Sequence, residues 1–175
     1  LTLVFSCIGP VMSVSAAESW ESGFYRAGGK VTSSNGIVTV GDGSSTATST
    51  YQSTSVGLTS TVIVTAKMRV TSYGTASGNN RGLFLSNGSW RVDLYLNENS
   101  VQTSSSSSSA VAFAVGKDRW HTYKFHVEGT MYNIYIDDKL VVTGTTRTHT
   151  KNMIQFWNVG DGSLEIDYLE IQKNA

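Results

Sequence analysis

The sequence predicts an all-β fold, built as a two-sheet antiparallel β-sandwich. Apolar and polar residues alternate through residues 123–128 and again through 132–136, and turn residues follow each run. Alternation with a period of two places every second side chain on one face of a strand, as in a sheet that is buried on one side. From residue 18 onward no segment has helical periodicity longer than a turn or two. We therefore expect strands joined by turns.

Ten strands are expected along the chain, each rich in β-branched or aromatic residues and bounded by turn residues. They span residues 36–40, 62–71, 81–86, 90–97, 110–115, 122–128, 132–137, 140–143, 153–159 and 164–172. Ten short strands with turns between them are typical of a sandwich of two layers.

The strand at 62–71 is expected to lie in the centre of a sheet. One face of it is apolar without interruption, through Val62, Val64, Ala66, Met68 and Val70. Burial of each larger side chain contributes about 1.5–3 kcal/mol, so this face should form part of the core.

Length and composition indicate one domain with a surface of low charge. The 175 residues are 39% hydrophobic and 15% charged, against roughly 25% charged in typical globular proteins. The 13 basic and 13 acidic residues give a net charge of +0, which provides no field to attract nucleic acid or anionic lipid. The serine run at 104–109 is expected to be a mobile loop, because it cannot bury enough apolar area to offset its ordering entropy.

Residues 1–17 are expected to be a secretory signal peptide that lacks its basic N-terminal region. An apolar run precedes small residues at 14–17 that suit a signal peptidase, and it is too short to span a bilayer of about 30 Å. Cys7, the one cysteine, lies within this segment, so the mature chain would contain no disulfide. We expect residues 18–175 to form one domain of a secreted or extracellular protein without a membrane anchor, and the lack of disulfides favours a bacterial source.

Four segments of the C-terminal half resemble a known superfamily. Residues 120–123 (WHTY) and 132–141 (YNIYIDDKLV) are similar to a hairpin of concanavalin A-like lectin/glucanase domains. Residues 154–160 and 166–171 are similar to the last two strands of that superfamily. Asp138 stands where the family has a turn glycine, which is tolerable because Asp adopts the left-handed conformation at modest cost.

The resemblance implies a jelly roll with one convex and one concave sheet, whose members mostly bind or cleave polysaccharides on the concave face. It covers roughly the C-terminal third of the chain with specific motifs. The same fold also has unrelated binding roles, so the fold alone does not identify a function.

The strand at 90–97 contains the best candidate ligand residues. Val92, Leu94 and Leu96 would face the core, which leaves a row of polar and aromatic side chains opposite: Arg91, Asp93, Tyr95 and Asn97. Sugars are bound by planar hydrogen-bonding groups together with an aromatic plane for their apolar C–H face. The alternative is that Arg91 and Asp93 form a solvated ion pair on a convex face, worth at most about 1 kcal/mol.

Two further residues are candidates for the same surface. If Ile154 and Phe156 face the core, Trp157 and Gln155 face outward, and Trp157 could form an aromatic platform. The alternative places Trp157 between the sheets. Arg81 is expected to add a second polar position beside the row.

A catalytic alternative comes from the string Glu165-Ile166-Asp167-Tyr168-Leu169-Glu170. It fits the E-x-D-x-x-E motif of family 16 glucanases, in which the outer glutamates act as nucleophile and acid/base about 5–5.5 Å apart and the Asp lies between them. This resemblance would assign the roles to Glu165, Asp167 and Glu170. Only residues 171–175 follow, however, and the string also resembles the closing strand of the same enzymes, which is the favoured interpretation.

A structural calcium ion is the one cofactor that the resemblance suggests. Several superfamily members hold calcium between their chain termini, and Glu21 with Asp167 could contribute ligands here. The three histidines have no metal-binding spacing, and no cysteine is available for zinc in the mature chain.

Three functions remain open at this point. The first is a secreted module that binds a polysaccharide or glycan on the concave sheet without altering it, through Arg81, Arg91, Asp93, Tyr95 and Trp157. The second is a retaining glycoside hydrolase that uses Glu165 and Glu170. The third is a cell-surface adhesion or structural module with a protein partner.

Overall fold

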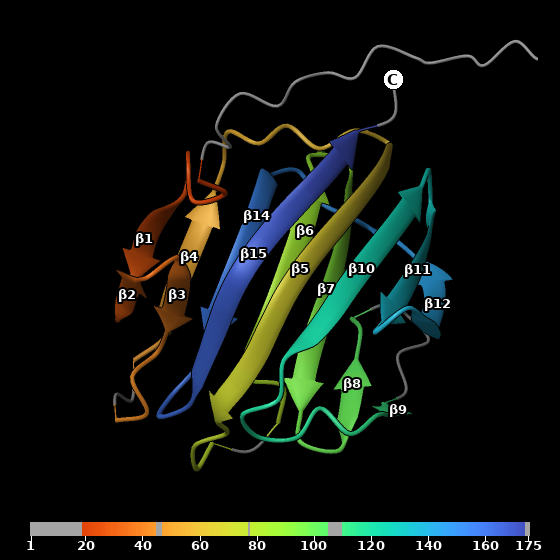
Figure 1. The fold of residues 1–175 in the computed structure, drawn as a ribbon. Coiled ribbons are helices and arrows are strands. Elements are labelled where there is room, and N and C mark those ends of the chain that lie inside the picture. The colour runs from red at the N-terminus through yellow and green to blue at the C-terminus, as the bar shows by residue number, and fades with distance from the viewer. Residues whose placement is uncertain (1–18, 45–46, 77, 105–109, 174–175) are drawn as a thin grey trace, which may run out of the picture.

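The computed structural model describes residues 19–44, 47–76, 78–104 and 110–173, and in this part of the chain every regular element is a β-strand. The strands form two antiparallel sheets packed face to face (Figure 1). The predicted all-β sandwich is therefore confirmed. None of these residues forms a helix of the length and apolarity needed to cross a membrane.

The two sheets contain eight and seven strands. In spatial order, the eight-stranded sheet contains β1 (Tyr25–Gly28), β4 (Ser49–Ser53), β14 (Asn152–Asn158), β6 (Arg81–Asn87), β7 (Trp90–Asn97), β8 (Ser100–Gln102) and β9 (Val111–Ala112), and β13 (Arg147–Thr148) also pairs with β7. The seven-stranded sheet contains β12 (Lys139–Thr145), β11 (Met131–Ile136), β10 (His121–Glu128), β5 (Thr61–Ser72), β15 (Ser163–Lys173), β3 (Ile37–Val40) and β2 (Val31–Ser34). Neighbouring strands of one sheet are often distant in sequence.

All ten expected strands occur, nine of them with ends within two residues of the prediction. The exception is 110–115, where only Val111–Ala112 pairs as β9. Five strands were not expected, namely β1, β2, β4, β8 and β13, because they are two to five residues long and mostly polar. The predicted signal peptide at 1–17 and residues 105–109 of the predicted serine loop lie outside the described residues.

The core lies between the sheets, and β5 contributes its predicted apolar face to it. The five side chains of that face are fully buried: Val62, Val64, Ala66, Met68 and Val70. β5 pairs with β10 on one side and β15 on the other, so it is central as expected. Its other face bears Lys67 and Arg69, which form ion pairs with β15.

The eight-stranded sheet buries its matching face against this layer. Three of its strands contribute side chains with no exposed surface: Leu83 and Leu85 from β6, Leu94 and Leu96 from β7, and Ile154 and Phe156 from β14. Because successive side chains of a strand point to opposite faces, the residues between these positions point away from the core. The sequence therefore predicted correctly which side chains of β7 and β14 face the core and which face outward.

The turn between β11 and β12 confirms the tolerance expected at Asp138. Asp137 and Asp138 have φ angles of 50° and 64°, so both occupy the left-handed region that two-residue hairpins require. Lys124 on β10 donates to the Asp138 carboxylate at 3.1 Å. Aspartate thus replaces the usual glycine without disrupting the hairpin.

A matched pair of leucine substitutions tests where the core lies. Leu164 has no exposed surface and Leu140 is 55% exposed. Leu164→Ala should lower the free energy of unfolding by about 2–5 kcal/mol, because it removes buried methyl groups and leaves a cavity. Leu140→Ala should change it by less than about 0.5 kcal/mol. Urea denaturation measures both values, and equal losses would contradict the described core.

Candidate binding cleft

The outer face of the eight-stranded sheet contains a cleft of about 520 Å³. Its walls come from β4, β14, β6 and β7 and from the segment that leads into β14. This volume lies in the range of about 300–1,000 Å³ that ligand sites of proteins occupy.

One row of side chains crosses five strands on this face. Strand registers place its members directly opposite one another, in the order Tyr25, Gln52, Gln155, Phe84 and Asp93. Gln155 donates to the Gln52 amide oxygen at 2.7 Å, and Gln52 donates to the Tyr25 hydroxyl at 2.7 Å. Hydrogen bonds therefore link three members of the row, and Phe84 separates them from Asp93.

The neighbouring row brings two aromatic rings together over a glycine. Trp157 on β14 and Tyr95 on β7 both lie opposite Gly82 of β6, one on each side. Their ring centroids are 5.4 Å apart and their planes are almost perpendicular, an edge-to-face contact that is worth about 0.5–1.5 kcal/mol. Trp157 thus lies on the outer face, and the alternative that it packs between the sheets is wrong.

Gly82 makes this contact possible. Its φ of 155° falls in a region that favours glycine, and an added Cβ would lie 1.8 Å from the Leu94 carbonyl oxygen and 3.1 Å from the Trp157 ring. Any other residue would push β7 or Trp157 away. The lack of a side chain at Gly82 therefore lets the Trp157 and Tyr95 rings meet. We call these two rings the aromatic wall.

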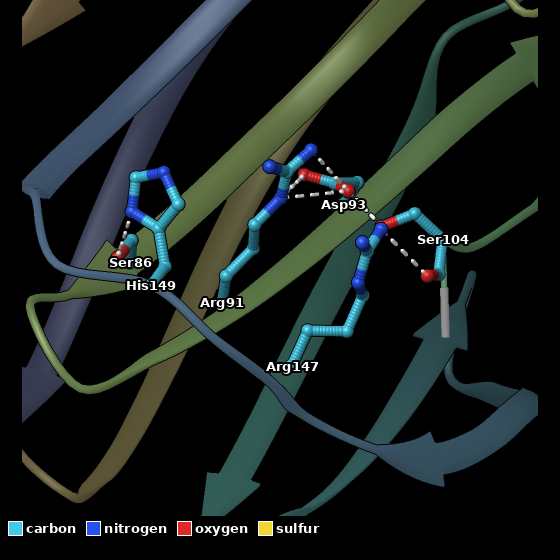
Figure 2. Close-up of polar contacts among 6 residues, drawn as sticks. All are labelled: Ser86, Arg91, Asp93, Ser104, Arg147 and His149. Atoms are coloured by element: carbon cyan, nitrogen blue, oxygen red, sulfur yellow. Dashed lines mark hydrogen bonds and ion pairs between the residues drawn. The ribbon is translucent and has the colours of Figure 1, made fainter. Parts of the chain in front are cut away.

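Arg91 and Asp93 form an ion pair inside the cleft (Figure 2). The Arg91 Nε lies 2.9 and 3.0 Å from the two carboxylate oxygens of Asp93, whose side chain is 2% exposed. Ser104 also donates its hydroxyl to Asp93. The alternative of a solvated surface pair is therefore wrong for Asp93.

The Asp93 charge raises the pKa of two neighbouring side chains, Arg91 and Tyr95. Partial burial opposes the charge of Arg91, but the hydrogen bonds and charge of Asp93 outweigh it and raise the pKa of the guanidinium. Burial and the Asp93 charge raise the pKa of the Tyr95 hydroxyl above its ordinary value. The Tyr95 hydroxyl therefore stays protonated at neutral pH and can donate a hydrogen bond to a ligand oxygen.

A group of basic residues that the sequence analysis did not identify lies beside the pair. Arg147, His149 and Lys151, which we call the basic row, alternate with threonine in the string RTHTK. Arg147 lies directly opposite Arg91 across β13 and β7, and His149 and Lys151 line the cleft. The alternation could have been recognised as one face of an extended segment, although it is too short and polar to predict a strand.

His149 is held in a defined orientation. Its Nδ1 accepts a hydrogen bond from the Lys151 backbone N–H at 3.2 Å and lies 3.1 Å from the Ser86 hydroxyl (Figure 2). The ring also packs edge-on against Phe84, 5.1 Å between centroids.

Arg81 does not belong to the cleft, so the expectation that it lies beside the row is wrong. It has the same parity on β6 as Leu83, points to the opposite side of the sheet and is 2% exposed. There it donates to the Asn158 side chain and the Tyr73 carbonyl, and burial lowers the pKa of its guanidinium. Arg81 connects strand ends of the two sheets.

The three acidic residues of the glucanase-like string lie on the other sheet. β15 is the last strand, as the closing-strand interpretation predicts, and it has a register shift between Ile166 and Tyr168. Glu165 is bound by Arg69 and Asp167 by Lys67, each at 2.6 Å. Glu170 borders a separate depression on that face, which Glu165 does not line.

The two carboxylates proposed for calcium each have a partner within the chain. Lys67 Nζ lies 2.6 Å from Asp167 Oδ2, so an ammonium already neutralises one of the two carboxylates. Glu21 accepts a long hydrogen bond from the Tyr51 hydroxyl at 3.5 Å. No cluster of three or more His, Cys, Asp or Glu residues suited to a metal occurs among the described residues. Calcium at Glu21 and Asp167 stays an untested prediction.

Solved structures match the fold, whereas the sequence has no match among protein-family models or curated proteins. The carbohydrate-binding module CBM66 from Bacillus subtilis superposes with a TM-score of 0.59 at 14% identity, over 86% of this chain and 96% of that one. The fold is that of the concanavalin A-like lectins and glucanases. The Bacillus licheniformis β-glucanase matches at 0.63 and 14% identity over 86% and 92%, and the Emp46p carbohydrate recognition domain at 0.65 and 12% over 89% and 90%.

Two glycine substitutions test the role of Gly82. Gly36 also has a positive φ, 76°, but an added Cβ there would meet nothing within 4 Å. Gly36→Ala should therefore cost only the backbone strain of about 1–2 kcal/mol. Gly82→Ala should cost roughly 1–3 kcal/mol more, because of the clash with the Leu94 carbonyl. Urea denaturation of both variants decides the point, and equal losses would show that close packing at Gly82 is unimportant.

Proposed function

We propose that this chain is a non-catalytic carbohydrate-binding module that holds a polysaccharide or glycan in the cleft. The proposal rests on one juxtaposition, in which the Tyr95 and Trp157 rings stand beside the Arg91–Asp93 pair. A sugar ring has hydroxyl groups at its edge and apolar C–H groups on its faces, so it needs both kinds of partner at once. Gln52 and Gln155 extend the hydrogen-bonding surface along the sheet.

The charges of the cleft support binding without cleavage. Most glycoside hydrolases place two carboxyl groups on either side of the scissile bond, one as acid and one as base or nucleophile. Among the described residues that line the cleft, Asp93 is the one carboxylate. It is buried and bound by Arg91, so it is poorly placed to act as either.

The structural neighbours support a carbohydrate ligand in general terms. Two of them are named as a carbohydrate-binding module and a carbohydrate recognition domain, and a third as a β-glucanase. Because one fold serves binding and hydrolysis alike, the residues of the cleft must decide between them. A secreted location, predicted from residues 1–17, accords with a polysaccharide ligand.

Loss of glycan retention tests the aromatic wall. Trp157→Ala and Tyr95→Ala should each weaken binding on the order of tenfold or more, about 1.4 kcal/mol, because each removes half of the sugar-stacking surface. Retention is measured by affinity electrophoresis in gels that contain a panel of polysaccharides. Tyr135→Ala, on the outer face of the seven-stranded sheet, is the matched control and should bind like the wild type. Unchanged retention of the Trp157 and Tyr95 variants would exclude this surface.

The same panel separates the two other hypotheses. Incubation with mixed-linkage β-glucan, β-1,3-glucan and sulfated galactan should release no reducing ends. Release that disappears in Glu165→Gln would instead support the hydrolase. If no polysaccharide is retained or cleaved, an adhesion module with a protein partner becomes the better hypothesis.

A further inference from the structure

The charges on the two outer faces of the sandwich are distributed differently. On the seven-stranded sheet, lysine and arginine side chains are matched by carboxylates in three ion pairs: Lys67–Asp167, Arg69–Glu165 and Lys124–Asp138. At the cleft, Asp93 is the one carboxylate among the described lining residues, whereas Arg91, Arg147 and Lys151 lie in or beside it. A chain with a net charge of +0 therefore has a local surplus of positive charge at its candidate site.

Two of these cations face each other directly. Arg91 and Arg147 are opposite residues of paired strands, an arrangement that is destabilising for like charges. Asp93 contacts Arg91, and Ser104 links it to Arg147, because the Ser104 hydroxyl donates to Asp93 and its carbonyl accepts from Arg147 at 3.1 Å (Figure 2). The Asp93 carboxylate pairs with Arg91, whereas Arg147 donates only to the Ser104 carbonyl, so an external anion could neutralise Arg147.

Lys151 adds a third cation at the end of the cleft. Its backbone is fixed, because its N–H donates to His149 and its carbonyl accepts from Ser86. Its side chain is exposed, and none of the ion pairs between described residues involves it. A fixed backbone with a free ammonium suits contact with a charged ligand.

We propose that the ligand of the cleft is an acidic glycan, a sugar chain with carboxylate or sulfate groups that contact the basic row. This inference rests on the proposed function and specifies its substrate class. Guanidinium and ammonium groups form their strongest hydrogen bonds with such oxyanions. The neutral part of the chain lies against Tyr95 and Trp157, as the proposed function requires.

The distance along β14 indicates a polymer rather than a single sugar. Met153 and Trp157 both line the cleft and are four residues apart on this strand, about 13 Å at 3.3 Å per residue. Lys151 lies beyond Met153 on the side away from Trp157. A ligand that touches both Trp157 and Lys151 must therefore be longer than a single sugar ring.

Binding of charged and neutral glycans by the whole chain tests the proposal. The probes are polygalacturonate and alginate for carboxylates, a sulfated galactan for sulfates, and an uncharged β-glucan and galactan, all measured by affinity electrophoresis and calorimetry. We expect at least one acidic polysaccharide to bind about tenfold more tightly than the uncharged ones, and to weaken as salt rises because exposed charges are screened. The carboxylate and sulfate probes show which group is preferred.

Charge-removing variants locate the interaction. Lys151→Gln and Arg147→Gln should each weaken acidic glycan binding about tenfold, since each removes one cation from the basic row. Lys139→Gln is the matched control, because Lys139 is exposed on β12 in the other sheet and loses the same charge. Thermal unfolding verifies that all three variants fold.

Three other outcomes would contradict the acidic-glycan proposal. Equal binding of charged and uncharged glycans, with no effect of Lys151→Gln, would overturn this inference and leave the proposed function intact. Retention of no glycan of either kind would overturn both. Acidic glycan binding that is lost in Lys151→Gln but unaffected by Trp157→Ala would indicate general adhesion of polyanions and would also overturn the inference.

Discussion

The burial of one face of the eight-stranded sheet is the constraint on which the candidate site depends. Leu83, Leu94 and Phe156 have no exposed surface, and they come from the three adjacent strands β6, β7 and β14. Because side chains alternate, their burial obliges Gly82, Tyr95 and Trp157 to share the outer face. A slip of one residue in any of these strands would send its site residues into the core. The site therefore follows from packing between the sheets.

The shape of the cleft depends on the close approach of the β6 backbone at Gly82 to β7. Residue 82 has no side chain, so the space above β6 is filled by the rings of its two neighbours in the row. Phe84, the next outward residue of β6, supports Arg91 and His149 from below, with the guanidinium 4.9 Å from its ring. Gly82 of β6 thus leaves room for the Tyr95 and Trp157 rings, and Phe84 of the same strand packs against Arg91 and His149. As a result, the aromatic wall lies beside the charged residues of the cleft.

The sequence predicted those features that depend on short-range periodicity. The outward parity of Arg91, Asp93, Tyr95 and Trp157 follows from alternation alone, and the structure brings these four residues into one cleft. The same alternation places Arg81 on the side of Leu83 and Leu85, so the expectation that Arg81 lies on the outer face departed from the pattern that was correct for β7 and β14. The basic row was missed for a different reason. Arg147 faces Arg91 through a strand pair that spans 56 positions, and no local pattern encodes such a contact.

The contrast between the two outer faces has a physical explanation in the cost of unpaired charge. Three cations of the seven-stranded sheet are each paired with a carboxylate, so these three have little left to offer an oxyanion. The cleft face keeps two arginines in opposition, which is unfavourable for like charges, and of the two only Arg91 pairs with the Asp93 carboxylate. A sandwich whose stability comes from its buried apolar faces can tolerate this arrangement, because surface charges contribute little to folding. Cations without a carboxylate partner, beside two aromatic rings in edge-to-face contact, are then better explained by a ligand than by the fold.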